Sequence, residues 1–342
     1  MFRIRIWDHC RYVRNRAAPY DEMARHMEAC RAAGVHRINV RMEEVISLDD
    51  CCRAAAANGL EIEARIAPDW SNPAPVFHTL PESGWEAMER EHGIRLRQVC
   101  MNHPDNRRFF VEAAGKLAAE YAGRLKALHL DFIRNGNALI TMGYPCECAG
   151  CRDSRRRYFG RETVAREDFR NPAVLYKELE FRNRNVRETV SEIKRLAGRN
   201  RMGLTMAARA NYLNQPDITD PPVWGLGPAV CEGQDWVDWL ACGLVDEVYP
   251  MNYHTDSAFF LGTLNDHLRL AGAGRDRLYC GIGLSTSMGE LGDEALESHL
   301  RAVRDAGLPG AAIFNKTNVY TPAQFAVIRG FADPCGGPRD ER

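Results

Sequence analysis

The sequence predicts an α/β protein, a single (β/α)8 TIM barrel over residues 1–331, and two observations lead to this prediction. Strand-like and helix-like segments alternate eight times along the 342 residues, and no linker or change in composition divides them. Several helical segments also end in glycine and continue directly into the next strand, as in AAGVHRINV and DAGLPGAAIF. The main alternative is an open doubly wound sheet, but a series of eight units favours a closed barrel.

The eight predicted strands are short segments that are apolar or that alternate between apolar and polar residues. In chain order they cover residues 3–7, 36–42, 61–68, 127–134, 203–210, 246–253, 278–284 and 310–317. The segments between them carry apolar residues at three- and four-residue spacing, the period of an amphipathic helix, as in YDEMARHMEACRAAG and DEALESHLRAVRDAG. Residues 332–342, ADPCGGPRDER, are expected to form a disordered C-terminal tail.

Three predicted loops are long, and all three follow the carboxyl end of a strand. They cover residues 69–103, 135–171 and 211–233, after the third, fourth and fifth strands. In a TIM barrel, the loops at the carboxyl ends of the strands build the active site. Loops of this length are usually functional when they are ordered. The sequence therefore predicts an elaborate site at this end of the barrel.

Composition and charge exclude several classes of protein. The 45 lysine and arginine residues nearly balance the 46 aspartate and glutamate residues, so we expect no nucleic-acid partner. The arginine-rich segment RDSRRRYFGR is a local exception that a solvated helix edge explains. No apolar run is long enough to cross a membrane, and the chain opens with a strand pattern in place of a signal peptide. We expect no membrane partner and a cytoplasmic location, and the sequence leaves open whether the chain forms a homo-oligomer.

Motifs for nucleotides and catalytic metals are missing from the sequence. The chain has no G-x-x-x-x-G-K-[ST] segment and no strand-linked G-x-G-x-x-G segment, so nothing indicates nucleotide binding. It has no H-E-x-x-H motif, and its ten histidines are dispersed. We therefore expect no organic cofactor.

Asp131 and Arg134 lie at the end of the fourth predicted strand, in the segment ALHLDFIR. A carboxylate at the carboxyl end of a barrel strand projects into the mouth of the barrel, where catalytic residues lie. Asp131 is therefore a candidate catalytic carboxylate. The alternative is a structural ion pair between Asp131 and a neighbouring arginine or lysine.

Three segments resemble a group of glycosyl-hydrolase-like TIM barrels that is loosely akin to α-amylase-type and family 42 β-galactosidase barrels. LHLDFIRNG is similar to their H-x-D-[FY]-I-R strand, and VCMNHPDNRRFF is similar to the C-P-x-x-P-x-x-R start of a helix. GQDWVDWLACGLVDEVYPMNYHTD, residues 233–256, is similar to a long G-Q-D-W-x-x-W-x-x-x-G-x-V-D-x-V-x-P-M-N-Y block. The resemblance implies hydrolysis of a glycosidic bond in a carbohydrate substrate, with Asp131 as catalytic carboxylate and Arg134 orienting it.

A glycosidase normally uses two carboxylates, and the second is not obvious in this sequence. The fifth and seventh strands end in MAARANY and GIGLSTS, which offer no acid. Acids near the ends of the other strands or in the long loops are Asp8, Glu43, Glu44, Asp69 and Glu232. We favour Glu232 and Asp69 as catalytic residues because each lies in a long loop, although most acids chosen in this way are salt-bridge partners or helix caps.

Sugar sites combine aromatic rings, which pack on the apolar faces of a pyranose, with polar groups that bind hydroxyls. Substrate-binding candidates of both kinds lie at or just past strand ends: Trp7, Asp8, Trp70, Arg209, Tyr212, Asn252, Tyr253, His254 and Lys316. The resemblance implies that Asn252 and Tyr253 line the site, because both match the long block. Arg209 and Lys316 either bind a carboxylate on an acidic sugar or balance the charge of Asp131.

The segment YPCECAGC carries Cys146, Cys148 and Cys151, and Cys100 lies at the end of the preceding long loop. A structural zinc site needs four tetrahedral ligands, and these cysteines would extend from neighbouring loops. The pattern resembles the structural zinc cluster of family 42 β-galactosidases, so we expect a structural Zn²⁺ bound by all four. Four thiolates leave no open coordination position, so this zinc would not be catalytic. The alternatives are free loop thiols or a redox pair.

Two other functions stay open for a barrel of this kind. One is a non-hydrolytic sugar isomerase or lyase, in which Lys316 or His254 would transfer protons. The other is a catalytically degenerate barrel that binds a saccharide without turnover. The lack of an obvious second carboxylate favours this last alternative.

Overall fold

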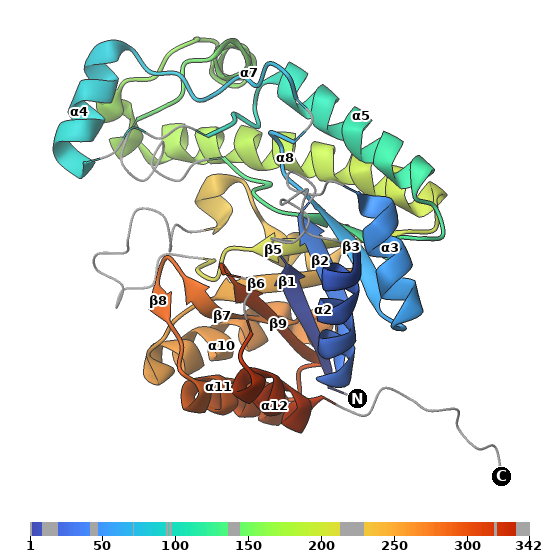
Figure 1. Ribbon diagram of the computed structural model, residues 1–342. Coiled ribbons are helices and arrows are strands. Elements are labelled where there is room, and N and C mark those ends of the chain that lie inside the picture. Colours follow the sequence, from blue (N-terminus) through green and yellow to red (C-terminus); the bar gives the residue numbers. More distant parts are fainter. Residues whose placement is uncertain are drawn as a thin grey trace.

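A closed barrel of eight parallel strands forms the centre of the molecule (Figure 1). The computed structural model describes residues 2–8, 20–41, 47–70, 72–93, 95, 98–135, 144–212, 229–317 and 320–332. The barrel strands are β1 (Arg3–Asp8), β2 (Val35–Arg41), β3 (Glu61–Ile66), β4 (Ala127–Leu130), β5 (Gly203–Ala208), β6 (Glu247–Asn252), β7 (Cys280–Thr286) and β9 (Gly310–Asn315). A short strand, β8 (Gly289–Glu290), pairs antiparallel with the end of β7. The predicted (β/α)8 barrel is confirmed.

The barrel closes where the last strand pairs with the first. β9 runs parallel to β1, with Ile4 opposite Ala311. Gly310 makes this approach feasible, because a Cβ at this position would lie 1.9 Å from the carbonyl oxygen of Arg3. A side chain here would force the two strands apart at the junction that completes the ring.

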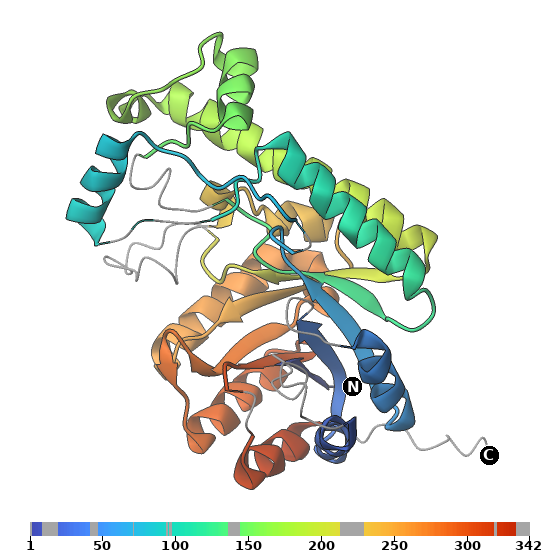
Figure 2. The same cartoon turned by 45° about the horizontal axis from the view of Figure 1, so that its top comes forward.

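Helices surround the barrel, and at least one follows each barrel strand (Figures 1 and 2). They are α2 (Tyr20–Ala32), α3 (Leu48–Ala57), α5 (Pro104–Glu120), α8 (Pro172–Arg199), α9 (Trp236–Ala241), α10 (Ser257–Ala271), α11 (Asp293–Asp305) and α12 (Pro322–Phe331). Three short 3-10 helices, η1 (Arg166–Arg170), η2 (Ala229–Glu232) and η3 (Gly272–Arg277), lie in the connections. None of the helices within the described ranges is both long and apolar enough to span a membrane.

Two of the predicted long loops contain helices of their own. The segment after β3 holds α4 (Glu82–His92), and the segment after β4 holds α7 (Ala149–Phe159). Figures 1 and 2 both show α4 and α7 beyond the barrel, on the side opposite α11 and α12. Most of the third predicted loop, residues 213–228, lies outside the described residues, as does the predicted tail from residue 333 onward.

The apolar core lies between the barrel and its helices, whereas much of the barrel interior is polar. Outward-facing strand residues such as Ile4, Ile38 and Leu128 are fully buried against the helices. Inside the barrel, Arg37 Nη1 lies 2.5 Å from Glu63 Oε1 and 3.0 Å from Glu247 Oε2. Buried charges of this kind need partners, because an unpaired charge in the interior costs several kcal/mol.

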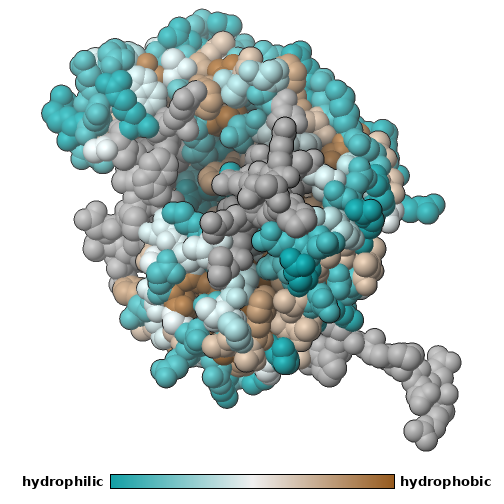
Figure 3. Space-filling model, in the orientation of Figure 1, coloured by the Kyte–Doolittle hydropathy of each residue, from teal (hydrophilic) through white to brown (hydrophobic). Residues whose placement is uncertain are grey.

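The surface shown in Figure 3 is mainly hydrophilic over the part of the molecule that contains α4. Among the coloured residues of this face, hydrophobic side chains gather only in small separate patches. Scattered exposed apolar residues are normal on a protein surface, so this view indicates no large hydrophobic interface.

Candidate active site

A cavity of about 380 Å³ opens at the carboxyl ends of the barrel strands. Every barrel strand, or the segment directly after it, contributes to its wall. The lining residues are Trp7, Asp8, Arg41, Arg65, Asp131, Phe132, Arg134, Ala207, Arg209, Met251, Tyr253, Thr286, Ser287, Met288, Phe314 and Lys316. This is the end of the barrel at which the sequence predicts the site, and the volume suits a small organic ligand.

Asp131 directly follows β4 and is held by two arginines. Arg65 places Nε 2.6 Å and Nη2 2.5 Å from Asp131 Oδ2, and Arg134 Nη1 lies 4.0 Å from Oδ1. Burial alone would raise the pKa of Asp131, but the charges of Arg65 and Arg134 outweigh burial and lower this pKa to about 2. Asp131 is therefore an ionised carboxylate at neutral pH and is unsuited to donate a proton there.

Phe132 has an unusual backbone conformation for a bulky residue. Its φ of 51° lies in the left-handed region, which disfavours side chains that carry a Cβ. This conformation points its N–H at Asp131 Oδ1 (2.7 Å) and leaves the residue 46% exposed at the mouth of the barrel. The ring packs on Arg134, whose Cζ lies 4.5 Å from the ring centroid. A strained, exposed aromatic residue beside a candidate catalytic carboxylate indicates a ligand contact.

Arg134 and Arg209 converge on Glu232, which lies behind the cavity wall. Arg209 Nε and Nη2 donate to the two carboxylate oxygens of Glu232 at 2.7 and 2.9 Å. Arg134 Nε lies 3.2 Å from Glu232 Oε2. Glu232 is fully buried and does not line the cavity. Glu232 therefore contacts two arginines from behind the cavity wall, and its predicted role as second catalytic carboxylate remains a prediction.

Asp8, at the end of β1, is the second carboxylate among the described lining residues. It is buried, and its Oδ2 lies 3.1 Å from Nε2 of His26 on α2. Burial alone would lower the pKa of His26, but its hydrogen bonds to Asp8 and Cys30 and the charges of these two groups together outweigh burial and raise this pKa well above its ordinary value. Because β1 and β4 are three positions apart in the ring of eight strands, Asp8 and Asp131 lie on roughly opposite sides of the mouth.

Trp7 is fixed by a chain of buried hydrogen bonds. Its Nε1 donates to His129 Nε2 at 3.0 Å, and His129 Nδ1 lies 2.8 Å from Thr205 Oγ1. The Thr205 hydroxyl then donates to Glu63 Oε2 at 3.2 Å. Four successive hydrogen-bonding groups therefore connect the cavity wall to the polar interior of the barrel.

Aromatic rings form the apolar part of the cavity wall. Tyr253 and Phe314 stack on each other, with ring centroids 5.3 Å apart and planes inclined by 12°. Trp7 meets both rings edge to face, at centroid distances of 6.4 Å from Tyr253 and 6.3 Å from Phe314. Rigid rings with an exposed face are suited to pack against a sugar.

The structure does not bring Asp69 or Trp70 to this cavity. The chain turns just after β3, where Trp70 N donates to the carbonyl oxygen of Ala67. Asp69 is therefore exposed, and Trp70 lines a separate groove along α5. Two further acids considered as catalytic residues, Glu43 and Glu44, lie outside the described residues.

Three more predicted substrate-binding residues lie beside the barrel mouth without lining the cavity. Their side chains contact residues in or next to neighbouring helices. The Tyr212 hydroxyl donates to Asp235 Oδ1 at 2.7 Å, Asn252 Nδ2 donates to the Phe260 carbonyl oxygen at 2.9 Å, and His254 stacks on Phe259 with centroids 5.8 Å apart.

Four lining residues that determine charge and stacking were not predicted from the sequence: Arg41, Arg65, Phe132 and Phe314. Arg41 ends β2 and Arg65 is the penultimate residue of β3, so the strand-end rule that identified Asp8 would also have found them. Phe132 lies inside the LHLDFIRNG segment, but nothing in that segment indicates its left-handed backbone.

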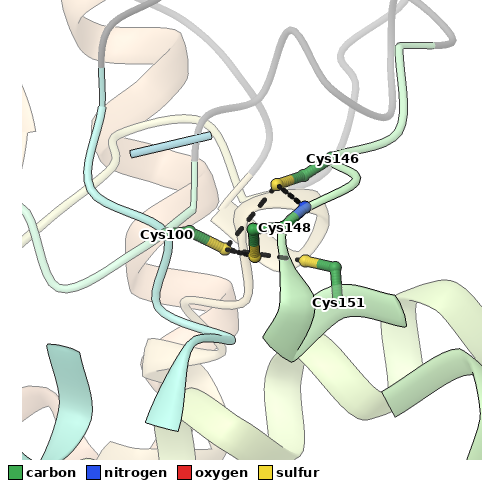
Figure 4. A group of neighbouring side chains, drawn as sticks. All are labelled: Cys100, Cys146, Cys148 and Cys151. Carbon is green, nitrogen blue, oxygen red and sulfur yellow. Dashed lines mark hydrogen bonds between the residues drawn. The ribbon is translucent and has the colours of Figure 1, made fainter. Parts of the chain in front are cut away.

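A second group of functional side chains, the cysteine cluster, consists of Cys100, Cys146, Cys148 and Cys151 (Figure 4). All four are buried, and their sulfur atoms lie within 4.8 Å of one another. Cys100 Sγ lies 3.5, 3.9 and 3.5 Å from those of Cys151, Cys146 and Cys148. A tetrahedral ion with Zn–S bonds of about 2.3 Å would separate its sulfurs by about 3.8 Å. The donor set therefore fits a metal such as zinc.

The surroundings of the cysteine cluster also suit thiolates. The backbone N–H groups of Thr79 and Cys148 both lie 3.4 Å from Cys146 Sγ, and Asn102 Nδ2 lies 3.4 Å from Cys151 Sγ. Donors of this kind orient ligands and stabilise negative charge on sulfur. Gly150 is required here, because a Cβ at this position would lie 2.5 Å from the carbonyl oxygen of Asn102.

No protein-family model matches the chain, and no curated protein matches it in sequence. Among solved structures, the chain is similar to the PgaB (BpsB) glycoside hydrolase domain from Bordetella bronchiseptica. The TM-score is 0.71, with 12% identity over 97% of this chain and 99% of that chain.

Two further solved structures are glycosidases with the same barrel. The catalytic domain of β-amylase from Paenibacillus polymyxa matches with a TM-score of 0.58 and 10% identity, over 96% of this chain and 97% of that chain. The endo-1,4-β-D-mannanase from Thermotoga petrophila matches with a TM-score of 0.54 and 13% identity, over 97% and 99%. At these identities the similarity shows the fold alone. The chain has the TIM-barrel fold that these structures share.

Proposed function

We propose that this chain is a glycoside hydrolase that acts on a carbohydrate in the cavity at the mouth of the barrel. The observation that carries the proposal is a pair of carboxylates, Asp131 and Asp8, which line one cavity from opposite sides. The rings of Trp7, Tyr253 and Phe314 supply an apolar surface for a sugar ring. The similarity of the fold to those of diverse glycosidases supports the proposal.

The two carboxylates have different surroundings, which suits two different roles. Asp131 is ionised because of Arg65, so it acts as the base or the nucleophile. Asp8 and His26 share a hydrogen bond at 3.1 Å, and this pair supplies the proton for the leaving glycosidic oxygen. Arg134, 4.0 Å from Asp131, keeps the ionised carboxylate in place.

Asp131→Asn tests the catalytic role, because this change keeps the shape of the side chain and removes its charge. We expect hydrolysis to slow by about 100- to 10,000-fold, the range for loss of a positioned acid or base. The assay is release of reducing ends from a panel of neutral and acidic oligosaccharides. Thermal melting checks the fold, because Arg65 loses its ionic partner.

Asp305→Asn is the matched control, since Asp305 is an exposed acid at the end of α11. It should hydrolyse every substrate at the wild-type rate. Turnover by a folded Asp131→Asn protein at the wild-type rate would refute the proposed role of Asp131.

A barrel that binds saccharides without turnover is the second candidate. It is favoured by one observation, that both lining carboxylates lie in ion pairs, Asp131 with Arg65 and Asp8 with His26. Saccharide binding by the wild type without product after long incubation would support it. A sugar lyase or isomerase that uses Lys316 is separated by product mass, because hydrolysis adds one water and these reactions add none. His254 does not line the cavity, which weakens its part in that alternative.

We also propose that the cysteine cluster holds a structural Zn²⁺ ion. Four buried thiols with sulfur separations of 3.5 to 3.9 Å around Cys100 support this assignment. A disulfide would need sulfurs about 2 Å apart, so these distances do not support a redox pair in its oxidised form. The resemblance of the cluster to that of family 42 β-galactosidases remains a prediction.

A further inference from the structure

Positive charge exceeds negative charge at the mouth of the barrel. Five cationic side chains line the described cavity: Arg41, Arg65, Arg134, Arg209 and Lys316. The described carboxylates are Asp8 and Asp131 in the wall and Glu232 behind it, so five minus three leaves two excess positive charges. A concave site with one predominant sign of charge concentrates ligands of the opposite sign.

Three of these cations already contact a carboxylate. Arg65 contacts Asp131 Oδ2 through both Nε and Nη2, and Arg209 forms a bidentate pair with Glu232. Arg134 contacts Glu232 Oε2 through Nε, at 3.2 Å. Lys316 follows β9 and is exposed at the rim of the cavity. The positive charge that remains for a ligand is therefore concentrated on Lys316 and on Nη1 of Arg134.

Arg134 is the most informative of these side chains. It is only 4% exposed, and its Nη1 has no hydrogen-bond partner among the described residues. Its Nη1 is 4.0 Å from Asp131 Oδ1, too far for a hydrogen bond. Burial and repulsion from Arg209 lower the pKa of Arg134 to about 10. A buried guanidinium with an unused donor in a cavity wall is suited to bind an anion.

We propose that the saccharide bound at this mouth carries an anionic group, either a carboxylate as in a hexuronate or a sulfate ester, and that Arg134 binds this group. Phe132 covers Arg134 from the solvent side and packs on the sugar ring. Lys316 adds a second positive charge at the rim. The inference rests on the proposed function only in that the ligand is a carbohydrate, and it does not require hydrolysis.

The first test compares matched ligands on the wild-type chain by NMR titration. The probes are D-glucuronate, D-glucose 6-sulfate, D-glucuronamide and D-glucose. Each anion should bind at least about tenfold more tightly than its neutral counterpart, the value of one charge-assisted hydrogen bond. The tighter of the two anions identifies the group. Equal affinity for anionic and neutral sugars, or no binding of any of the four, would overturn the inference.

The second test replaces Arg134 by lysine, which keeps a positive charge beside Glu232 but lacks the planar guanidinium. We expect Arg134→Lys to weaken binding of the preferred anion about fivefold or more, and to weaken it by a larger factor than binding of the neutral sugar. Arg301→Lys, at an exposed arginine on α11, is the matched control and should bind like the wild type. Unchanged anion affinity in a folded Arg134→Lys protein would contradict the assignment to Arg134.

The outcome separates this inference from the proposed hydrolase. If the protein prefers D-glucuronate or the sulfate but hydrolyses no glycan, the anionic-ligand inference holds and the hydrolase proposal fails. If the protein hydrolyses neutral glycans and shows no preference for anions, the hydrolase proposal holds and the anionic-ligand inference fails.

Discussion

His129 must be neutral in the folded protein, because of its bond to Trp7. The indole N–H only donates, so His129 Nε2 has to accept at 3.0 Å and its proton resides on Nδ1, which faces Thr205. Burial agrees with this assignment and lowers the pKa of His129 to about 4. In a protonated His129, Nε2 would carry a hydrogen and would face the Trp7 N–H donor to donor. This repulsion would displace the Trp7 ring in the cavity wall.

Acid should therefore destabilise the fold in a defined window. The folded state keeps His129 neutral down to about pH 4, whereas an unfolded histidine binds a proton near its ordinary pKa of 6.5. Between these values the unfolded chain holds the extra proton, so the free energy of unfolding should fall as pH falls, by about 3 kcal/mol from this residue. Urea denaturation of the wild type at several pH values measures this slope.

His129→Gln provides the comparison for this pH dependence. Its amide can still accept from Trp7 and donate to Thr205, but it does not titrate. In this variant the free energy of unfolding should change less steeply with pH between pH 6.5 and 4. Part of the pH dependence should remain, because burial also lowers the pKa of His267 to about 4. A slope equal to that of the wild type would show that His129 is not protonated on unfolding in this range.

The left-handed backbone of Phe132 predicts opposite effects on stability and binding. Phe132→Gly and Phe132→Ala both remove the ring, so each should weaken sugar binding, by about tenfold if the ring stacks on the ligand. Only glycine relieves the strain at φ 51°, so Phe132→Gly should be more stable than Phe132→Ala by about 1 kcal/mol. Thermal melts and NMR titrations measure the two effects. Equal stability of the two variants would argue against strain at this position.

The cysteine cluster links α7 to α8 on one side and to the segment after β4 on the other. Arg155 on α7 forms a fully buried bidentate pair with Glu178 on α8, and it also donates to the Cys146 carbonyl oxygen at 2.8 Å. On the other side, Met101 N, next to Cys100, donates to Asn135 Oδ1 at 3.1 Å. Asn135 is the neighbour of Arg134, so the cluster supports the segment that positions the candidate ligand-binding arginine.

Metal removal should therefore affect both stability and binding. We expect purified protein to contain about one zinc ion per chain, measured by elemental analysis. Cys148→Ser should lose most of this zinc, lower the melting temperature and weaken saccharide binding, because its remaining three thiolates no longer close the site. Cys242→Ser is the control, since Cys242 is exposed and lies outside the cluster. Zinc-free wild type, or a Cys148→Ser protein with full zinc content, would rule out the structural ion.

Across the entire chain, hydrophobic period was enough to locate the barrel strands, but it did not reveal where some of them end. The predicted strand over residues 127–134 stops at Leu130, because the left-handed φ of Phe132 breaks the ladder just beyond it. Charged residues at alternate strand positions, such as Arg37 and Glu63, look like a solvent-facing edge in the sequence. In the structure they face the barrel interior and pair with each other. Closure buries a surface that a lone strand would expose.

The candidate site could be predicted only in part, for similar reasons. Asp131 and Asp8 were found because each lies at a strand end, where direction follows from the fold. Asp69 and Glu232 were chosen because they lie in long loops. Where the side chain of a loop residue points depends on turns and ion pairs that the local sequence does not reveal. Cys146, Cys148 and Cys151 were found because their C-x-C-x-x-C spacing is a local signal. Cys100 was added from its place at the end of the preceding long loop, and its contact with Cys151 depends on the tertiary structure.

The pairing of β1 with β9 has a consequence for how the protein is made. Arg3 and Gly310 are opposite each other although almost the whole chain separates them. During synthesis, β1 emerges first and has to wait for its second partner until the ribosome has added nearly every residue. Until then both borders of the growing sheet carry unpaired backbone groups that can capture another chain. A shortened chain that lacked β9 would keep this exposed edge permanently, so we expect it to aggregate.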